Sequence, residues 1–431
     1  HLALLPVAGM GHLMPFLRLG AMLAARGATV TIITAHPTVT TAESDHLSRF
    51  FSQFPAINRL EFHLIPREEY NSELKNDDPF FIQFESIGKS AHLLVPQLSS
   101  LSPPLSALVA DFPVNAALSE ISDALSIPLY TLITTSARFF TIMFHLPRIL
   151  EDNKKEAIEI PKLGKIPSSS IPPIMLDQAH FFSSFITSNA LTLHKSKGIL
   201  INTFHSFEPE AIQCLTNPLP CPILPIGPLD VYDQHQPFNL LPWLDNQSPG
   251  SVVYVSFGNR TSLSKQQLQE LGHGLEKSRC KFLWVVKSKK VDTEDTEGID
   301  EILGGPFVER NKERGMILKG WVDQEKILGH PSVGGFMSHC GWNSVMEAAR
   351  LGVPILAWPQ HGDQRINADV VEKGGLGIWP EEWGWLGQKL VKRDEISNMI
   401  SKLMGENEGC IEKAQLVKEK ANAAKQVGNE S

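Results

Sequence analysis

Short, uninterrupted apolar runs that alternate with helical segments constrain the fold of this chain more than any other feature of the sequence. Residues 2–7 form one such run and residues 28–34 the next, and between them apolar residues recur at helical spacing from Leu13. Strands that are apolar on both faces are typical of parallel sheets covered by helices on both sides. The start of the chain therefore predicts a β-α-β unit, with a glycine-bearing turn after the strand and Pro15 in the first turn of the helix.

The alternation occurs twice along the chain. Further strand-like runs lie at 107–110, 129–134 and 198–202, and a second series lies at 252–256, 282–286, 316–319, 333–338 and 353–358. Proline and polar residues crowd the stretch between the two series. We therefore expect two doubly wound α/β domains, residues 1–228 and 250–431, joined by a linker at 229–249 and facing each other across a cleft. Ligands of such sheets bind at the carboxyl ends of the strands.

One segment of the second series does not fit the alternation. Residues 287–302 are acidic, polar and aperiodic. Such a composition is typical of solvated loops, so we expect this segment to lie outside the core.

Charge and cysteine content exclude several classes of protein. With 39 Lys and Arg residues against 47 Asp and Glu residues the net charge is −8, so no general basic surface would attract nucleic acid. The five cysteines form no C-x-x-C pair, which is typical of reduced thiols in the cytoplasm. The most apolar long stretch, residues 129–146, is interrupted by Arg138, so we expect no membrane-spanning helix. We expect a cytoplasmic monomer.

A strand-to-helix junction in the second half has the features of a phosphate site. The apolar run 333–338 leads into a turn, and a helix begins near Trp342. Gly341 lets the backbone approach a ligand, and the free amides and positive dipole end of the helix favour a diphosphate. His339, Asn343 and Ser344 add side-chain donors.

Polar and aromatic residues around this junction extend the predicted site. Glu347, one turn into the helix, can accept hydrogen bonds from vicinal hydroxyls such as those of a ribose. Trp321 offers a flat face for a base. Asp363 and Gln364 can together accept from and donate to the hydroxyls of a hexose. Taken singly, Trp321 could be a core residue and Asp363 a helix cap, but their spacing favours a nucleotide-sugar site.

A histidine and an aspartate follow two strands of the first half. His12 comes directly after the first strand, and imidazole titrates near neutral pH, which suits removal of an acceptor proton. Asp111 stands at the carboxyl end of another predicted parallel strand, where it could orient the ring and stabilise the imidazolium. Because these ends share one edge of the sheet, we expect a catalytic pair.

A nicotinamide-dependent oxidoreductase is the main alternative of another class. Gly9-x-Gly11 after a strand is half of a dinucleotide fingerprint. The complete G-x-G-x-x-G is absent, and the second strand ends at Thr34-Ala35-His36, without an acidic residue for ribose hydroxyls. Both features argue against NAD(P) binding.

The block from Trp321 to Gln364 resembles the donor-binding box of plant secondary-metabolite UDP-sugar glycosyltransferases, and the two-domain organisation is similar to their GT-B fold. The resemblance implies that Trp321 stacks on uracil and that glucose, favoured by Gln364, is the sugar. UDP-glucose is then a co-substrate, and no cofactor or metal is expected. The remaining implied contacts are Val322 and Gln324 near the base, Glu347 on the ribose, His339, Asn343 and Ser344 on the diphosphate, and Trp342, Asp363 and Gln364 on the sugar.

The same resemblance extends to other parts of the chain. The turn at Gly258 is similar to a second phosphate loop of the family, although Asn259 replaces the usual Ser or Thr. His12 and Asp111 resemble the His/Asp dyad of the family, which argues against a non-catalytic UDP-sugar binder. Ser136 resembles a residue that reaches the sugar from the N-terminal domain.

Four short motifs resemble the flavonoid C-glycosyltransferase branch: residues 6–12, 78–80, 258–261 and 361–368. The resemblance implies an inverting enzyme that forms a β-C-glucoside on a phloroglucinol-type ring, as in 2-hydroxyflavanones or dihydrochalcones such as phloretin. A flavonoid or phenol O-glucosyltransferase remains an alternative, because both reactions use the same base and donor site. The residues expected around this small phenolic acceptor are Met10, Phe81, Pro113, Phe140, Phe144 and His361.

Overall fold

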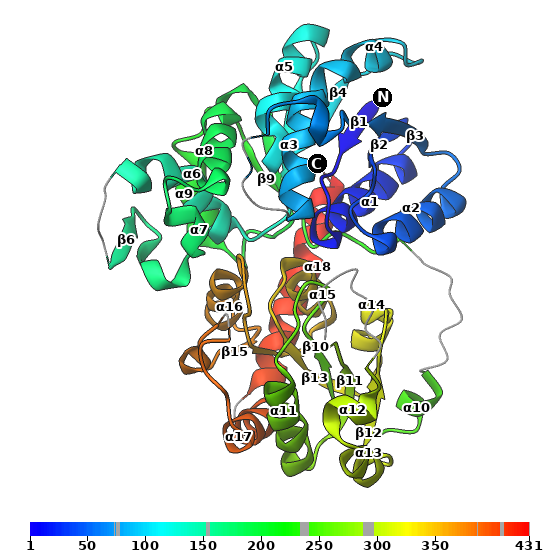
Figure 1. The fold of residues 1–431 in the computed structure, drawn as a ribbon, viewed down its shortest axis with the longest axis vertical. Coiled ribbons are helices and arrows are strands. Elements are labelled where there is room, and N and C mark those ends of the chain that lie inside the picture. Colours follow the sequence, from blue (N-terminus) through cyan, green and yellow to red (C-terminus); the bar gives the residue numbers. More distant parts are fainter. Residues whose placement is uncertain are drawn as a thin grey trace. The chain divides into compact units, whose positions relative to one another are not determined.

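The computed structural model describes residues 1–72, 74, 78–151, 156–232, 241–287, 297–385, 387–405 and 409–430. The chain divides into two compact units, His1–Gln234 and His235–Ser431, and each unit is built on one parallel sheet (Figure 1). The predicted pair of parallel α/β sheets is therefore confirmed. Residues 233–240 of the predicted linker lie outside the described residues.

The sheet of the first unit has the strand order β3-β2-β1-β4-β5-β8-β9, and all neighbours are parallel. The chain order reverses between β1 and β4. In doubly wound sheets this switch point opens a crevice at the carboxyl ends of the strands. The strands are β1 (Leu2–Leu5), β2 (Val30–His36), β3 (Asn58–His63), β4 (Ala107–Asp111), β5 (Leu129–Ile133), β8 (Gly198–Ile201) and β9 (Ile223–Pro225), with a separate antiparallel hairpin of β6 (Ala157–Ile160) and β7 (Gly164–Pro167).

Helices cover both faces of this sheet because successive side chains of each strand point to opposite sides. Ala3 and Leu5 pack into one apolar cluster with Phe84, whereas Leu4 packs into the other with Phe16. The helices are α1 (Met10–Ala25), α2 (Thr41–Gln53), α3 (Pro79–Ser90), α4 (Leu94–Ser99), α5 (Asn115–Leu125), α6 (Ala137–Glu151), α7 (Pro173–Leu176), α8 (Phe181–Thr192) and α9 (Pro209–Thr216), with short 3-10 helices η1 (Arg67–Glu69), η2 (Ala91–Leu93), η3 (Phe112–Val114), η4 (Ser168–Ser170) and η5 (Leu193–Lys195).

The first helix begins earlier than its apolar pattern predicts. Gly9 has φ 104°, a backbone conformation that favours glycine, and it turns the chain directly into α1 at Met10. Pro15 consequently lies inside the helix instead of in its first turn. His12 therefore belongs to the first turn of α1, where the helix backbone fixes its direction.

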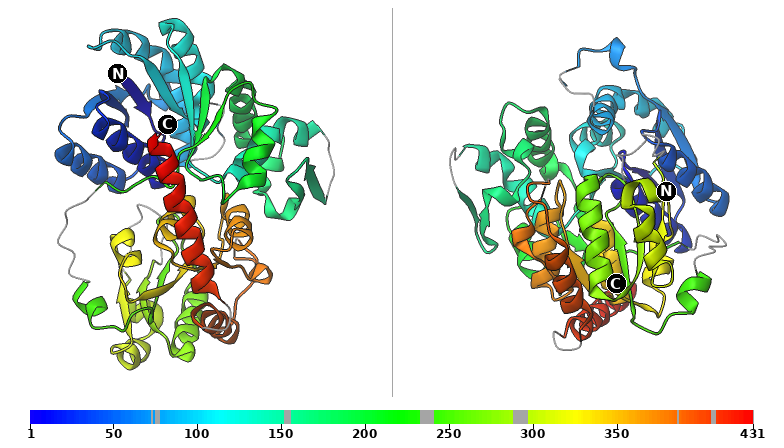
Figure 2. Two further views of the ribbon diagram at one scale, coloured as in Figure 1. Left: turned by 180° about the vertical axis from the view of Figure 1, so that it is seen from behind. Right: turned by 60° about the horizontal axis from the view of Figure 1, so that its bottom comes forward.

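The sheet of the second unit has the parallel order β12-β11-β10-β13-β14-β15, with its switch point between β10 and β13. The strands are β10 (Val252–Ser256), β11 (Lys281–Val285), β12 (Gly315–Leu318), β13 (Val333–Ser338), β14 (Ile355–Ala357) and β15 (Gly377–Ile378). The helices are α10 (Leu241–Asp245), α11 (Lys265–Ser278), α12 (Ile299–Leu303), α13 (Gly305–Asn311), α14 (Gln324–Leu328), α15 (Trp342–Leu351), α16 (Gln364–Lys373), α17 (Arg393–Met404) and α18 (Cys410–Glu430), with η6 (Glu381–Trp383). Figure 2 shows the last helix, α18, in red.

The predicted solvated loop at 287–302 is wrong at its end. Residues 288–296 lie outside the described residues, but Ile299–Leu303 forms α12, and Ile302 is completely buried in the core of the second unit. Its acidic neighbours Asp300 and Glu301 lie in the first helical turn, where negative charge is favourable. The acidic composition at 300–301 therefore marked the start of a helix.

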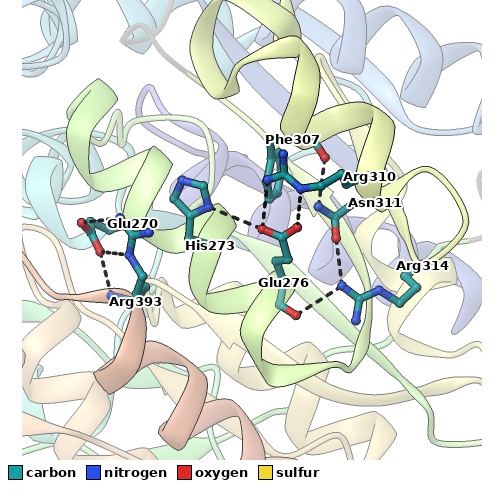
Figure 3. A network of polar contacts seen from close by, with 8 residues as sticks. All are labelled: Glu270, His273, Glu276, Phe307, Arg310, Asn311, Arg314 and Arg393. Carbon is teal, nitrogen blue, oxygen red and sulfur yellow. Dashed lines mark hydrogen bonds and ion pairs between the residues drawn. The ribbon is translucent and has the colours of Figure 1, made fainter.

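Ion pairs tie three helices of the second unit together (Figure 3). Glu270 of α11 accepts from the guanidinium of Arg393 of α17 at 3.1 and 3.2 Å and from its backbone N–H at 2.8 Å. Arg393 accordingly lowers the pKa of Glu270 to about 2. Glu276 of α11 pairs with Arg310 of α13 at 2.9 Å. This network lies on the helical layer and not at the strand ends.

Two further properties concern membrane-spanning helices and disulfide bonds. Among the described residues, no helix is long and apolar enough to cross a bilayer. All five cysteines are described, and none of them forms a disulfide.

Candidate active site

The switch point of the first unit brings His12 and Asp111 together as predicted. β1 pairs with β4 in parallel, with Leu5 opposite Ala110, so the residues that follow each strand share one edge of the sheet. Nδ1 of His12 lies 2.9 Å from Oδ2 of Asp111. Asp111 is completely buried, whereas the His12 side chain is 30% exposed.

The hydrogen bonds of this pair define the tautomer of the imidazole. A carboxylate accepts hydrogen bonds and does not donate them, so Nδ1 of His12 carries the proton that lies between the two groups. Oδ2 of Asp111 also accepts from Val7 N at 3.3 Å, and Thr134 Oγ1 lies 3.1 Å from Nδ1. In the neutral ring Nε2 is therefore the unprotonated nitrogen, which is the tautomer that general-base catalysis requires.

Two residues that support His12 were missed from the sequence. Thr134 directly follows β5 and contacts the ring. Glu43 of α2 is buried, and its carboxylate accepts from Gly9 N at 2.6 Å and from Val39 N at 3.2 Å. Thr40-x-x-Glu43 has the spacing of a local helix cap. The sequence therefore gave no signal that this carboxylate holds the turn before His12.

Aromatic side chains of α3 and α8 lie beside the base. Phe84 meets the His12 ring edge-on, with 6.1 Å between centroids. Phe81, which the sequence predicted at the acceptor site, stacks on Phe182 at 5.0 Å, and Phe84 stacks on Phe185 at 5.9 Å. Phe84 is buried and the other three rings are half-buried, and of the four only Phe81 was predicted at the acceptor site.

The other residues predicted for the acceptor are dispersed. Met10 is half-buried in the first turn of α1, and Pro113 is buried in η3. Phe140 is completely buried and packs edge-on against Phe112, and its contact with an acceptor stays a prediction. Phe144 lines a cavity of about 280 Å³ formed with residues of α6, α8 and 218–220.

Ser136 also has a structural role that the sequence did not indicate. It is completely buried, and its Oγ accepts from Phe139 N at 3.1 Å at the start of α6. The contact with a donor sugar stays a prediction.

At the switch point of the second unit, one imidazole is enclosed by two glycines. A Cβ on Gly341 would lie 2.5 Å from Nε2 of His339, and a Cβ on Gly258 would lie 2.6 Å from it. Both positions therefore need glycine for the ring to fit. This packing joins the turn after β10, where Asn259 is exposed, to the start of α15. The two predicted phosphate-binding turns are thus neighbours.

His339 is an uncharged ring with an unused polar atom. Burial, with a smaller effect of the nearby His361, lowers the pKa of His339 to about 3. Nδ1 of His339 is buried and has no hydrogen-bond partner among the described residues. A buried polar atom without a partner is costly, and a ligand oxygen would satisfy it. This observation fits the predicted diphosphate contact.

The residues predicted for the nucleotide form a connected group. Nε2 of Gln324 donates to Ser344 Oγ and to Glu347 Oε2, both at 2.8 Å. The buried Tyr254, which the sequence did not indicate, donates its hydroxyl to Gln324 Oε1 at 3.4 Å. Trp321 is 41% exposed, an unusual exposure for a tryptophan. Val322 and Asn343 are half-buried, and Trp342 is buried.

The structure shows which hydrogen bonds engage the predicted sugar-binding pair, Asp363 and Gln364. Asp363 precedes α16 but makes no capping hydrogen bond with its side chain. Oε1 of Gln364 accepts from Gln360 N at 2.8 Å and from His361 N at 3.0 Å. The oxygen of Gln364 is therefore engaged by the backbone, and its Nε2 lies 3.5 Å from Nδ1 of His361. His361 contacts Thr261 at 3.2 Å.

Comparison with known proteins places these features in a family. Residues 186–382 match the family described as UDP-glucoronosyl and UDP-glucosyl transferase. The chain is 47% identical to UDP-glycosyltransferase 708C1 of Fagopyrum esculentum, over 100% of this chain and 93% of that protein. It is 41% identical to UDP-glycosyltransferase CGT of Oryza sativa subsp. japonica, over 98% and 92%.

Solved structures give the same result. LpCGTa in complex with UDP matches with a TM-score of 0.87 and 44% identity, covering 99% of this chain and 95% of that one. Phytolacca americana UGT2, complexed with UDP-2fluoro-glucose and pterostilbene, matches with a TM-score of 0.83 and 28% identity, covering 98% and 94%.

The chain belongs to the plant UDP-glycosyltransferase family, and it is an enzyme with the α/β architecture of that family. Within the family it belongs to the C-glycosyltransferase branch, together with the 708 and CGT relatives. The alternative of a nicotinamide-dependent oxidoreductase is thereby wrong, in agreement with the incomplete glycine fingerprint.

Proposed function

We propose that this enzyme transfers glucose from UDP-glucose to a ring carbon of a phloroglucinol-type flavonoid precursor, with inversion to the β-C-glucoside. In this proposal residues 1–228 bind the acceptor and residues 250–431 bind the donor. The observation that carries it is the bond from His12 Nδ1 to the buried Asp111, which leaves Nε2 as a base. The aromatic rings beside His12, Phe81 and Phe84, support a flat phenolic acceptor.

The proposed reaction balances without any redox step. Nε2 of His12 takes a phenolic proton, and the negative charge of the phenolate spreads to the ortho carbon. That carbon attacks the anomeric carbon of the α-linked donor, the bond from the anomeric carbon to the phosphate oxygen breaks, and UDP leaves with the electron pair. The substituted ring carbon then loses its hydrogen as a proton and aromaticity returns. Asp111 stabilises the imidazolium while it exists.

In the proposed UDP-glucose site, uncharged groups donate the hydrogen bonds to the diphosphate. The start of α15, with Ser344 and the uncharged His339, would stabilise the charge that develops on the diphosphate. Trp321 would stack on uracil, Glu347 would hold the ribose, and Asp363 with Nε2 of Gln364 would hold glucose. We propose that no divalent metal is needed. We also propose that the enzyme acts in the cytoplasm.

The test is to incubate the enzyme with UDP-glucose and phloretin, with and without EDTA, and to analyse the product by acid treatment and mass spectrometry. We expect UDP release unchanged by EDTA and a glucoside that survives acid and fragments within the sugar ring. An acid-labile glucoside would identify O-transfer instead. A strict requirement for a divalent ion would contradict the metal-independent mechanism.

A further inference from the structure

One buried amide joins the predicted sugar site to the predicted phosphate turn. Asn367 of α16 is completely buried. Its Nδ2 donates to Asp363 Oδ2 at 2.9 Å and to the backbone carbonyl of Cys340 at 3.0 Å. The two protons of a single side-chain amide are therefore both engaged, one on each part of the donor site.

The orientation of this amide follows from its surroundings. Both neighbours, a carboxylate and a carbonyl, only accept hydrogen bonds, so the nitrogen and not the oxygen of Asn367 must face them. The oxygen, Oδ1, is buried without a hydrogen-bond partner among the described residues. An amide kept in this position at the expense of an unsatisfied oxygen indicates that the two donated bonds matter.

The bond to Cys340 acts on a residue in an uncommon conformation. Cys340 has φ 64°, in the left-handed region that non-glycine residues rarely adopt. Its N–H donates to Ser338 Oγ at 3.1 Å, and its carbonyl accepts from Asn367, so side chains hold the backbone on both sides of this residue.

Fixing the Cys340 carbonyl also fixes the next N–H. The peptide between Cys340 and Gly341 is planar, and in a trans peptide the N–H points opposite to the C=O. Because the carbonyl points at Asn367, the N–H of Gly341 points away from it. Gly341 is the N-cap of α15, where backbone N–H groups form the anion-binding end of the helix.

We propose that Asn367 is a positioning residue. It fixes the position of the sugar-binding carboxylate of Asp363 relative to the diphosphate-binding turn at Cys340. The inference rests on the proposed donor site. Through one bond Asn367 directs Asp363, and through the other it aims the backbone of the turn. Loss of this amide should therefore weaken binding of UDP itself, which carries no sugar, as well as use of UDP-glucose.

The experiment compares four single variants by calorimetric titration with UDP, by the KM for UDP-glucose, and by the free energy of unfolding. Asn367→Leu removes both donors at similar volume, and Asn367→Asp places an acceptor against two acceptors. Asp363→Asn removes the charge that would face the sugar but keeps an amide oxygen that can still accept from Asn367. Asn311→Leu is the matched control, because Asn311 is equally buried on α13 and donates to Phe307 O at 2.9 Å (Figure 3).

We expect Asn367→Leu to raise both the Kd of UDP and the KM of UDP-glucose, each about tenfold, the effect of about one lost hydrogen bond. Asn367→Asp should raise both further. Asp363→Asn should raise the KM and leave the Kd of UDP within about twofold. Asn311→Leu should lower stability and leave the Kd of UDP unchanged.

The coupling is overturned if Asn367→Leu binds UDP like the wild type, whether or not the KM rises. If Asn367→Leu does not fold, Asn367→Ser replaces it, since a hydroxyl can donate to only one of the two acceptors. It should raise one of the two constants, and no change in either would refute the inference. If the wild type binds UDP but forms no glucoside, the proposed acceptor chemistry fails, while the UDP titrations still test Asn367.

Discussion

At the switch point of the first unit a carboxylate holds the turn, whereas at the switch point of the second unit an amide does so. Glu43 accepts from the backbone N–H of Gly9, just before His12. Asn367 donates to the backbone C=O of Cys340, just before α15. Both clamps are buried side chains that come from a helix elsewhere in the same unit.

The difference bears on the ligand that each turn would serve in the proposed function. The carboxylate of Glu43 engages the backbone N–H of Gly9 in the first turn, so this N–H is not available to an anion. The amide of Asn367 donates to the backbone C=O of Cys340 and carries no charge, so the backbone N–H groups of the second turn remain directed to an anion. Two units of similar topology thus hold the turn at the switch point with side chains of opposite hydrogen-bonding polarity.

Replacing the base gives the largest expected effect within this comparison. We expect His12→Ala to lower kcat about 10³-fold, because general-base catalysis contributes about 10²- to 10⁴-fold. The Kd of UDP should stay within about twofold, since the second unit is untouched. Turnover assays and UDP titration check both halves, and a large loss of UDP affinity would contradict the separation of roles.

A change in the tautomer of the His12 imidazole should have the next largest effect on kcat. Asp111→Asn replaces the acceptor facing Nδ1 by an amide, and we expect kcat to fall about 10²-fold because Nε2 is then protonated more often. Thr134→Val, which removes a weaker neighbour of Nδ1, is the matched variant and should cost only a few-fold. Equal losses in the two variants would show that the carboxylate does not set the tautomer. The measurement is the dependence of kcat on pH.

Replacing Glu43, whose carboxylate holds the turn before His12, should have a smaller effect. Glu43→Gln leaves one oxygen where the carboxylate has two, so either Gly9 N or Val39 N loses its partner. We expect kcat to fall about tenfold through misplacement of His12, with the Kd of UDP unchanged. A wild-type kcat in a folded Glu43→Gln protein would show that the turn does not need this clamp.

A network outside both switch points should affect stability alone. In the folded protein the pKa of Glu270 is lowered to about 2, below its ordinary 4.5. A lowered folded pKa stabilises above the unfolded value, and this stabilisation is lost as pH falls from 4.5 towards 2. Glu270→Gln should therefore reduce the free energy of unfolding by about 1 kcal/mol at pH 7 and by less at pH 3.

Denaturant unfolding at both pH values measures this effect. Lys277→Gln is the control, because its pair with Asp394 is exposed and should contribute little. Unchanged kcat in both variants is expected, and a loss of activity would mean that the helical layer reaches the site.

The strands and the donor residues were the parts most accessible from the sequence. Continuous apolar runs such as Val333–Ser338 predicted central strands because both faces of a parallel sheet are buried. Edge strand β3 was missed because only Phe62 of its six residues is buried. Most of the predicted donor residues lie in one contiguous block, Trp321 to Gln364, so spacing along the chain carried most of the information.

Tertiary contacts were not accessible in this way. Glu43 and Asn367 act on turns that are distant in sequence, and no local spacing reports such a contact. The oxygen of Gln364 is engaged by two backbone N–H groups, which becomes visible only when the turn before α16 is built. Polar side chains have several possible partners, and packing selects among them.

The imidazole enclosed by Gly258 and Gly341 makes two turns that are distant in sequence depend on one side chain. Even a methyl group at either glycine would collide with the ring of His339, so neither glycine can be replaced while the histidine keeps this position. In the proposed donor site, preference for the sugar would then depend on other residues, namely Asp363, Gln364 and their neighbours. Efforts to retune the sugar should accordingly leave this triple untouched and vary the residues that precede α16.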